Sequence, residues 1–147
     1  MSESTQHLRL VRSILTYLER EFSGLAGFAV FDDTAEPSRG EKPPRINGHV
    51  PDVYAVDVPP CTTIIGEAKT RQDLETERSR EQIATFLDYL SRRANGVFVL
   101  AVPLEVAATA RGLVAAVSGG QEASTTRVVI LDGVSYLTTN SRDRARC

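Results

Sequence analysis

The chain has 147 residues, of which 41% are hydrophobic and 24% are charged, a balance that is ordinary for one globular domain. Its net charge of −2 argues against a protein that coats nucleic acid by bulk electrostatic attraction, although a local basic surface stays compatible with it. No hydrophobic run approaches the roughly 18 residues of a membrane span, and the first residues lack a signal peptide's apolar segment, so we expect a cytoplasmic protein without membrane contact. The two cysteines, Cys61 and Cys147, are too few for a disulfide framework and lack the partners of a zinc site.

The first expected element is an amphipathic helix. Apolar residues recur at helical spacing over residues 7–22, and the glycines at positions 24 and 27 stop the pattern. Residues 25–33 are typical of a strand. Residues 34–49 are polar and rich in proline and glycine, which indicates a loop.

The second half of the chain alternates strands and helices. Residues 50–70 are typical of two neighbouring strands that are joined around two prolines, and a short connection leads from them to a helix that ends near Arg93. A strand buried on both faces is expected over residues 96–103, an alanine-rich helix over residues 104–117, and a final buried strand over residues 127–133.

The predicted order of elements is therefore α-β-β-β-α-β-α-β. The first three strands would form a meander, whereas the later strands arrive through helical crossovers, which favours parallel pairing. This order predicts an α/β fold with a mixed central sheet that helices flank on both faces. We expect one domain over residues 1–140 and a frayed, flexible tail over residues 141–147.

Strand alternation brings two acids and a lysine together in the central hairpin. Glu67 and Lys69 share one face of their strand, while Gly66 and Ala68 point to the other face, where small side chains permit close packing. If the hairpin is centred on its two prolines, Asp52 is the direct cross-strand neighbour of Glu67, with Cβ atoms roughly 4.5–5.5 Å apart. Such a pair repels unless a cation intervenes, so the pattern predicts a Mg²⁺ site beside an ammonium group, a combination suited to phosphodiester hydrolysis.

The segments Pro51-Asp52 and Glu67-Ala68-Lys69 resemble the signature of the PD-(D/E)XK nuclease superfamily, which includes restriction endonucleases and Holliday-junction resolvases. The element order over roughly residues 6–103 resembles the restriction-endonuclease-like αβββαβ core of that family, here with an additional C-terminal α-β unit. The alternative without a functional role is an exposed aspartate at a strand start and a surface Glu-x-Lys pair.

The resemblance implies a DNA endonuclease that depends on Mg²⁺, with Mn²⁺ as a substitute, and leaves 5′-phosphate ends. It implies Asp52 and Glu67 as metal ligands, the backbone carbonyl of Ala68 as a third ligand, and Lys69 as the catalytic lysine. Each of these roles is carried over from the family's motif onto the matching residue of this chain.

Two helices could add to the site. In several family members a glutamine on the helix after the motif supports the site, and Gln82 is similar to it; Gln82 also fits the third position of a capping box that begins at Ser79. The family often adds an acid from the first helix. Glu19 and Glu21 flank the apolar stripe there, and we prefer Glu19 because it lies farther from the helix end, although a solvated helix face explains either one alone.

Basic residues flank the motif on both sides and are expected to grip DNA phosphates, although solvated surface charge explains any one of them alone. The candidate DNA-binding residues are Lys42, Arg45, Arg71 and Arg78. His7 is expected only to begin the first helix, and His49 to lie in a loop. The nine aromatic residues are mostly spaced as core, so no platform for single strands is expected.

The expected function is DNA cleavage in repair and recombination, as in junction resolvases, or in restriction and defence. A homodimer would supply the two sites that cutting both strands needs, and a larger repair or defence complex is a further candidate partner. The alternative is a noncatalytic nuclease-fold module that binds DNA or a partner protein, or an assembly subunit whose acids pair only with its own arginines.

Overall fold

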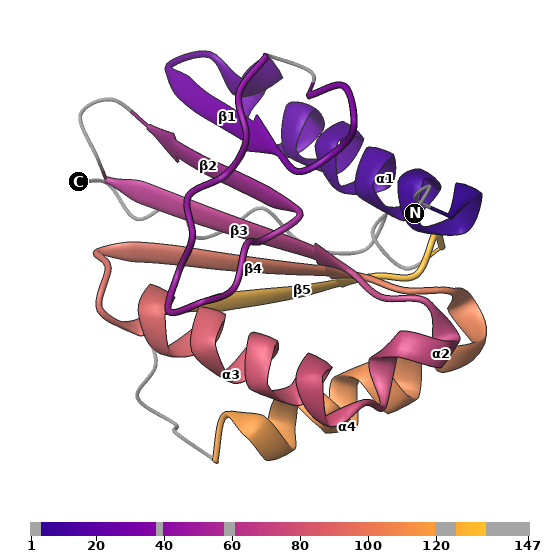
Figure 1. The fold of residues 1–147 in the computed structure, drawn as a ribbon. Helices are drawn as coiled ribbons and strands as arrows, with labels where there is room; N and C mark the ends of the chain where they lie inside the picture. Colours follow the sequence, from indigo (N-terminus) through magenta and orange to yellow (C-terminus); the bar gives the residue numbers. More distant parts are fainter. Residues whose placement is uncertain (1–3, 38–39, 58–60, 120–125, 135–147) are drawn as a thin grey trace.

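Figure 1 shows the computed structural model of the chain, which describes residues 4–37, 40–57, 61–119 and 126–134. The first helix, α1 (Thr5–Glu21), begins two residues earlier than predicted, because Ser4 caps it: the Ser4 hydroxyl accepts a hydrogen bond from the backbone N–H of His7 at 3.1 Å. It ends one residue before a short 3₁₀ turn, η1 (Ser23–Leu25), in which Gly24 has a φ of 70°. The expected glycine stop is therefore confirmed.

Five strands form one mixed sheet within the described residues. They are β1 (Phe28–Asp32), β2 (Val53–Asp57), β3 (Thr62–Ala68), β4 (Asn95–Ala101) and β5 (Arg127–Leu131). They follow one another in sequence order across the sheet. The β1–β2 and β2–β3 pairs are antiparallel, and the β3–β4 and β4–β5 pairs are parallel. The predicted meander, the parallel crossovers and the α/β class are thereby confirmed.

Helices cover both faces of the sheet (Figure 1). One face lies under α1, and the other lies under α3 (Glu77–Ser91) and α4 (Ala107–Val117), which follow the short segments α2 (Arg71–Leu74) and η2 (Leu104–Val106). The two crossovers advance in the same direction across the sheet, so a right-handed connection places both helices on the same face. The stretch after β3, expected only as a connection, forms the helical turn α2.

Each face of the sheet has its own hydrophobic core. The cluster under α1 includes Val11, Ile14 and Leu18 of the helix, and the cluster under α3 includes Ile83 and Phe86. The strands thus lie between two apolar layers, which is the arrangement that a buried parallel pair of strands requires.

Three further features concern residues outside the sheet and its covering helices. The loop before β2 folds toward the α3 side, where the His49 ring meets the Phe86 ring edge-on at 6.4 Å between centroids. Cys61 is disulfide-bonded, against the expectation from so few cysteines, and Cys147 lies outside the described residues, as does the tail expected over residues 141–147. No helix in the described part of the chain is long and apolar enough to cross a membrane.

Candidate active site

The register of the β2–β3 hairpin brings Asp52 and Glu67 together. The pairs run from Val53↔Gly66 to Val56↔Thr63, which confirms the register expected from a turn centred on the two prolines. One step beyond the first pair, the backbone N–H of Asp52 donates a hydrogen bond to Glu67 Oε1 at 3.0 Å. The acid at the end of β3 therefore lies directly against the start of β2.

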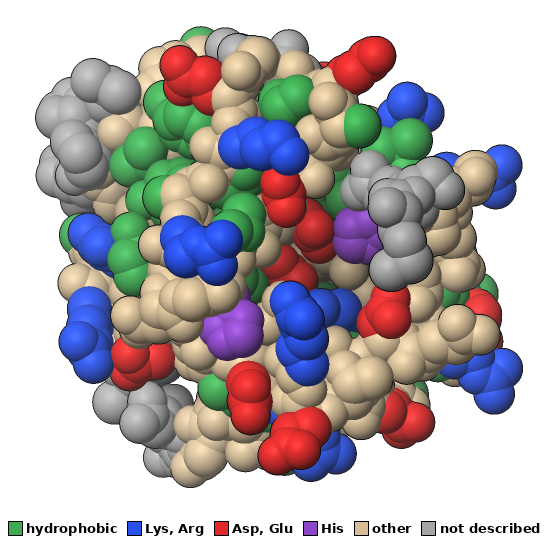
Figure 2. Space-filling view, in the orientation of Figure 1, with side chains coloured by type: hydrophobic (Ala, Val, Ile, Leu, Met, Phe, Trp, Pro, Cys, Tyr) green, Lys and Arg blue, Asp and Glu red, His purple; other side chains and the backbone are tan. Residues whose placement is uncertain are grey.

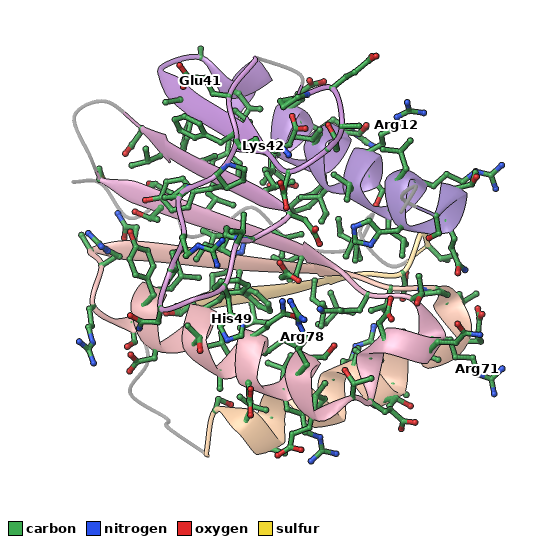
Figure 3. All side chains as sticks on the ribbon, viewed as in Figure 1. Arg12, Glu41, Lys42, His49, Arg71 and Arg78 are labelled. Carbon is green, nitrogen blue, oxygen red and sulfur yellow. The ribbon has the colours of Figure 1, made fainter. Side chains whose placement is uncertain are left out.

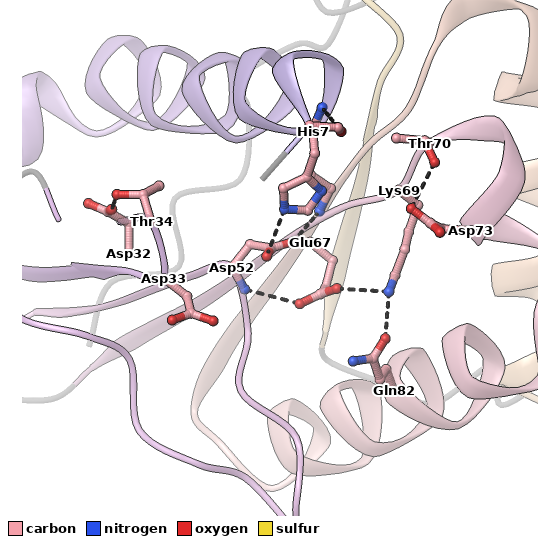
Figure 4. Close-up of polar contacts among 12 residues, drawn as sticks. His7, Asp32, Asp33, Thr34, Asp52, Glu67, Lys69, Thr70, Asp73 and Gln82 are labelled. Atoms are coloured by element: carbon pink, nitrogen blue, oxygen red, sulfur yellow. Dashed lines mark hydrogen bonds and ion pairs between the residues drawn. The ribbon is translucent and has the colours of Figure 1, made fainter. Parts of the chain in front are cut away.

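The Asp52 carboxylate is held through both of its oxygens (Figure 4). Oδ2 accepts a hydrogen bond from the backbone N–H of Ala68 at 2.8 Å, and Oδ1 lies 3.2 Å from Nε2 of His7. The Asp52 side chain is 15% exposed. Both carboxyl groups thus meet at one end of the hairpin rather than on opposite faces of the sheet.

Lys69 stands beside Glu67 on the α3 side. Its Nζ lies 3.4 Å from Glu67 Oε2 and donates a hydrogen bond to Oε1 of Gln82 at 2.5 Å. Glu67 and Lys69 are both buried, and Gln82 reaches them from α3. The ammonium group is therefore oriented by Glu67 near the end of β3 and by Gln82 on α3.

The capping role considered for Gln82 is wrong. Thr76 caps α3, because its hydroxyl accepts a hydrogen bond from the backbone N–H of Ser79 at 3.2 Å, and the helix begins at Glu77. Gln82 therefore lies in the second turn, clear of the unsatisfied N–H groups at the helix start. Its side chain contacts Lys69 instead.

The opposite face of β3 is packed closely against α1. A Cβ atom built on Gly66 would lie 2.7 Å from Cγ2 of Ile14 and 3.1 Å from Cβ of Val53. Ala68 is buried in the same cluster as Ile14. This confirms that the small residues alternate with Glu67 to let a helix approach the strand.

Burial dominates the electrostatics of Glu67. Loss of solvent and then the negative charge of Asp52 raise the pKa of Glu67 to about 8, while Lys69 and the Asp52 N–H oppose this rise. Acids whose pKa is shifted by burial together with a specific charged neighbour cluster at functional sites.

The donor set at this point suits a small divalent cation. Asp52 and Glu67 offer hard oxygen ligands, and each carboxylate oxygen keeps lone-pair capacity beyond the single contact described above. Across the described ranges no group of three or more His, Cys, Asp and Glu side chains is placed to hold a metal ion. Two carboxylates would therefore need the Ala68 carbonyl and solvent to complete a coordination shell.

Glu19, the acid preferred from the first helix, is not brought to this site. It is exposed and lies twelve residues beyond His7 in α1, which corresponds to about 18 Å along the helix axis. Glu21, the alternative, lies still farther along. The residue of α1 that contacts Asp52 is His7, which was expected only to begin the helix.

A signal for His7 was present in the sequence. His7 falls on the same helical stripe as Val11, Ile14 and Leu18, since these positions are separated by four, three and four residues. A polar residue that extends the buried stripe of a helix points toward the sheet rather than toward solvent.

The basic residues surround the acids unevenly. Figure 2 shows acidic side chains in the middle of one face of the molecule, set between basic side chains above and below them. Figure 3 places Lys42 and Arg78 on opposite sides of this group and Arg71 away from it, beyond α2. Lys42 forms an ion pair with Asp33 at 3.3 Å, and Arg45, also exposed, donates to the carbonyl of Gly48 at 3.1 Å.

Comparison of the chain with protein-family models, with curated proteins and with solved structures finds no match.

Proposed function

We propose that this protein is a metal-dependent DNA endonuclease of the PD-(D/E)XK type, with the restriction-endonuclease-like αβββαβ core and an added C-terminal α-β unit. The observation that carries the proposal is the buried Glu67 carboxylate, which lies between the backbone N–H of Asp52 and the ammonium group of Lys69. The five-stranded mixed sheet and the order of its elements support it.

In this proposal Asp52, Glu67 and the backbone carbonyl of Ala68 hold Mg²⁺, or Mn²⁺ in its place. A bound ion of this kind supplies an activated water and neutralises charge on a phosphate group. Ala68 and His7 keep the Asp52 carboxylate oriented through their hydrogen-bond contacts.

Lys69 presents its charge to the phosphate that is attacked. Its ammonium group stabilises the negative charge that develops on the phosphoryl oxygens. Because Lys69 is buried, little water competes with this interaction, which strengthens it. Gln82 acts on the reaction through Lys69, since its amide oxygen accepts a hydrogen bond from Nζ and holds the side chain in place.

DNA is the proposed substrate, with Lys42 and Arg78 as the phosphate contacts on either side of the acids and Arg45 farther out. Arg71 lies beyond α2, away from the acids, and is not a phosphate contact in this proposal. Cleavage of both strands would require two copies of the site, so a homodimer or a larger repair or defence complex in the cytoplasm is part of the proposal. The same chemistry serves recombination, repair and restriction.

The test is nicking of supercoiled plasmid DNA. Wild-type protein should nick with Mg²⁺ or Mn²⁺ and stop when EDTA is added, and Glu67→Gln and Lys69→Gln should lower the rate at least 100-fold. Glu19→Gln is the matched control, because it makes the same chemical change far from the site and should nick as wild type. Equal nicking by Glu67→Gln, or nicking that survives EDTA, would contradict the proposal.

A noncatalytic module that binds DNA or a partner protein is the second candidate. It is favoured by the contacts that Asp52, Glu67 and Lys69 make with one another and with their neighbours, which give each charge a partner within the protein itself. Such a module would shift DNA in a gel equally well with EDTA, and Lys69→Gln would leave that shift unchanged.

A further inference from the structure

His7 joins two parts of the molecule that are 45 residues apart in sequence. Its Nε2 lies 3.2 Å from Oδ1 of Asp52, and its side chain is 22% exposed. An ionised carboxylate can only accept a hydrogen bond, so when Asp52 is ionised Nε2 carries the hydrogen in this contact. Figure 4 shows the imidazole reaching from the first turn of α1 to the carboxylate.

The place of His7 is set by three independent features. Ser4 caps the helix through the backbone N–H of His7 itself, which orders the first turn. Val11 and Ile14 continue the same stripe into the core and hold the helix on the sheet. Gly66 allows the close approach, because any Cβ there would meet Ile14.

Asp52 needs such support because it lies just before β2 and not within it. The Ala68 N–H holds only Oδ2, which leaves the carboxylate able to turn about its terminal torsion. The His7 contact at Oδ1 engages the second oxygen and restrains that rotation. Partners that orient a metal-binding carboxylate typically contribute 10- to 100-fold to metal affinity or activity.

We infer that His7 is a positioning residue that holds the Asp52 carboxylate ready for the divalent cation. This inference rests on the proposed function, since it takes Asp52 as a metal ligand. His7 acts through Asp52 and touches neither the phosphate nor the attacking water. His49, by contrast, packs against Phe86 and serves as an internal comparison.

The test is isothermal titration calorimetry of the purified protein with Mn²⁺. His7→Ala should bind Mn²⁺ 10- to 100-fold more weakly than wild type, and His49→Ala should bind as wild type. His7→Gln places an amide N–H at a similar reach and should recover most of the affinity. Circular dichroism melts of all variants check that the fold is kept.

A cleavage assay separates positioning from a purely structural role. For His7→Ala the half-saturating Mg²⁺ concentration should rise 10- to 100-fold, while kcat at saturating Mg²⁺ stays within about threefold of wild type. A lower kcat that extra Mg²⁺ does not restore, together with a lower melting temperature, would overturn the inference.

The two proposals fail in different ways. If Asp52→Asn abolishes Mn²⁺ binding but His7→Ala binds within twofold of wild type, the metal site stands and the role of His7 is refuted. If wild-type protein binds no Mn²⁺ at all, the proposed function and the inference are both refuted.

Discussion

The two faces of β3 differ in chemistry although they come from one strand of seven residues. On the α1 face, Gly66 and Ala68 are small and apolar, and the helix packs against them closely. On the α3 side, the acid Glu67 and the base Lys69, which directly follows β3, lie away from solvent next to Gln82. Strand alternation makes this separation possible, because adjacent residues never share a face.

The contrast shows that the packed face supports the charged one. A buried ion pair is weak support for stability, since removing both charges from water offsets most of their attraction. Packing on the α1 face and among the apolar residues around α3 must therefore offset the cost of burying charged groups at the end of β3. Changes on the two faces should separate stability from function.

The largest expected effect concerns the pH dependence of stability at Glu67. Its pKa is raised to about 8 in the folded protein, so the folded state binds more protons than the unfolded state between pH 4.5 and about 8. The stabilisation is full below pH 4.5 and is lost as pH rises through 8. The neutral side chain in Glu67→Gln does not ionise and so keeps this stabilisation at high pH. In EDTA at pH 9 we therefore expect the free energy of unfolding of Glu67→Gln to exceed that of wild type by on the order of 4 kcal/mol.

Urea unfolding at pH 5, 7 and 9 measures this difference. Glu19→Gln is the control, because the exposed Glu19 should leave the wild-type pH slope unchanged. A slope for Glu67→Gln that equals the wild-type slope would show that Glu67 is not a buried, proton-binding acid.

Bound metal should offset the loss of stability that ionised Glu67 causes at high pH. A cation that binds only the folded protein stabilises it by about 2.7 kcal/mol at 100 times its dissociation constant. Wild-type protein at pH 8 should therefore gain melting temperature when Mg²⁺ is added, and Asp52→Asn should gain none. A gain of equal size in Asp52→Asn would place the bound ion elsewhere.

On the packed face, Gly66→Ala should destabilise the fold by about 1–3 kcal/mol, because the new Cβ would lie 2.7 Å from Ile14 Cγ2 and α1 must shift. Gly112→Ala in α4 is the matched control. Among the described atoms outside its own helix, a Cβ on Gly112 would meet nothing within 4 Å, so alanine should stabilise that helix by about 0.5–1 kcal/mol. Denaturant midpoints of the two variants should move in opposite directions, and a shared direction would refute the close-packing argument.

Much of the site followed from local rules. The register was expected from centring the hairpin on its two prolines, and the alternation at Gly66 and Glu67 from strand periodicity. The antiparallel meander and the parallel pairing of the later strands followed from the hairpin and the helical crossovers. These features depend on neighbours in sequence or on the next strand, which a single sequence encodes directly.

The errors came from longer-range geometry. Thr76 and Ser79 are both good caps, and a shift of three residues between them decided whether Gln82 served the helix end or Lys69. Which end of α1 meets the hairpin depends on how the helix docks, so the acid at Glu19 was preferred where His7 makes the contact. Periodicity specifies a face of a helix but not the position along it that reaches a partner.

The smallest stability effect is expected where charge lies in solvent. Lys42→Gln breaks the exposed ion pair with Asp33 and should change the unfolding free energy by less than about 1 kcal/mol.

Lys42→Gln should have a measurable effect on DNA binding, because each lost phosphate contact lowers the slope of log affinity against log salt by about 1. Arg71→Gln is the control, since Arg71 points away from the acids. Fluorescence anisotropy with duplex DNA between 50 and 200 mM salt, in EDTA, measures both slopes. If Arg71→Gln lowers the slope and Lys42→Gln does not, DNA lies across α2 and not over the acids, and the proposed path of the substrate is wrong.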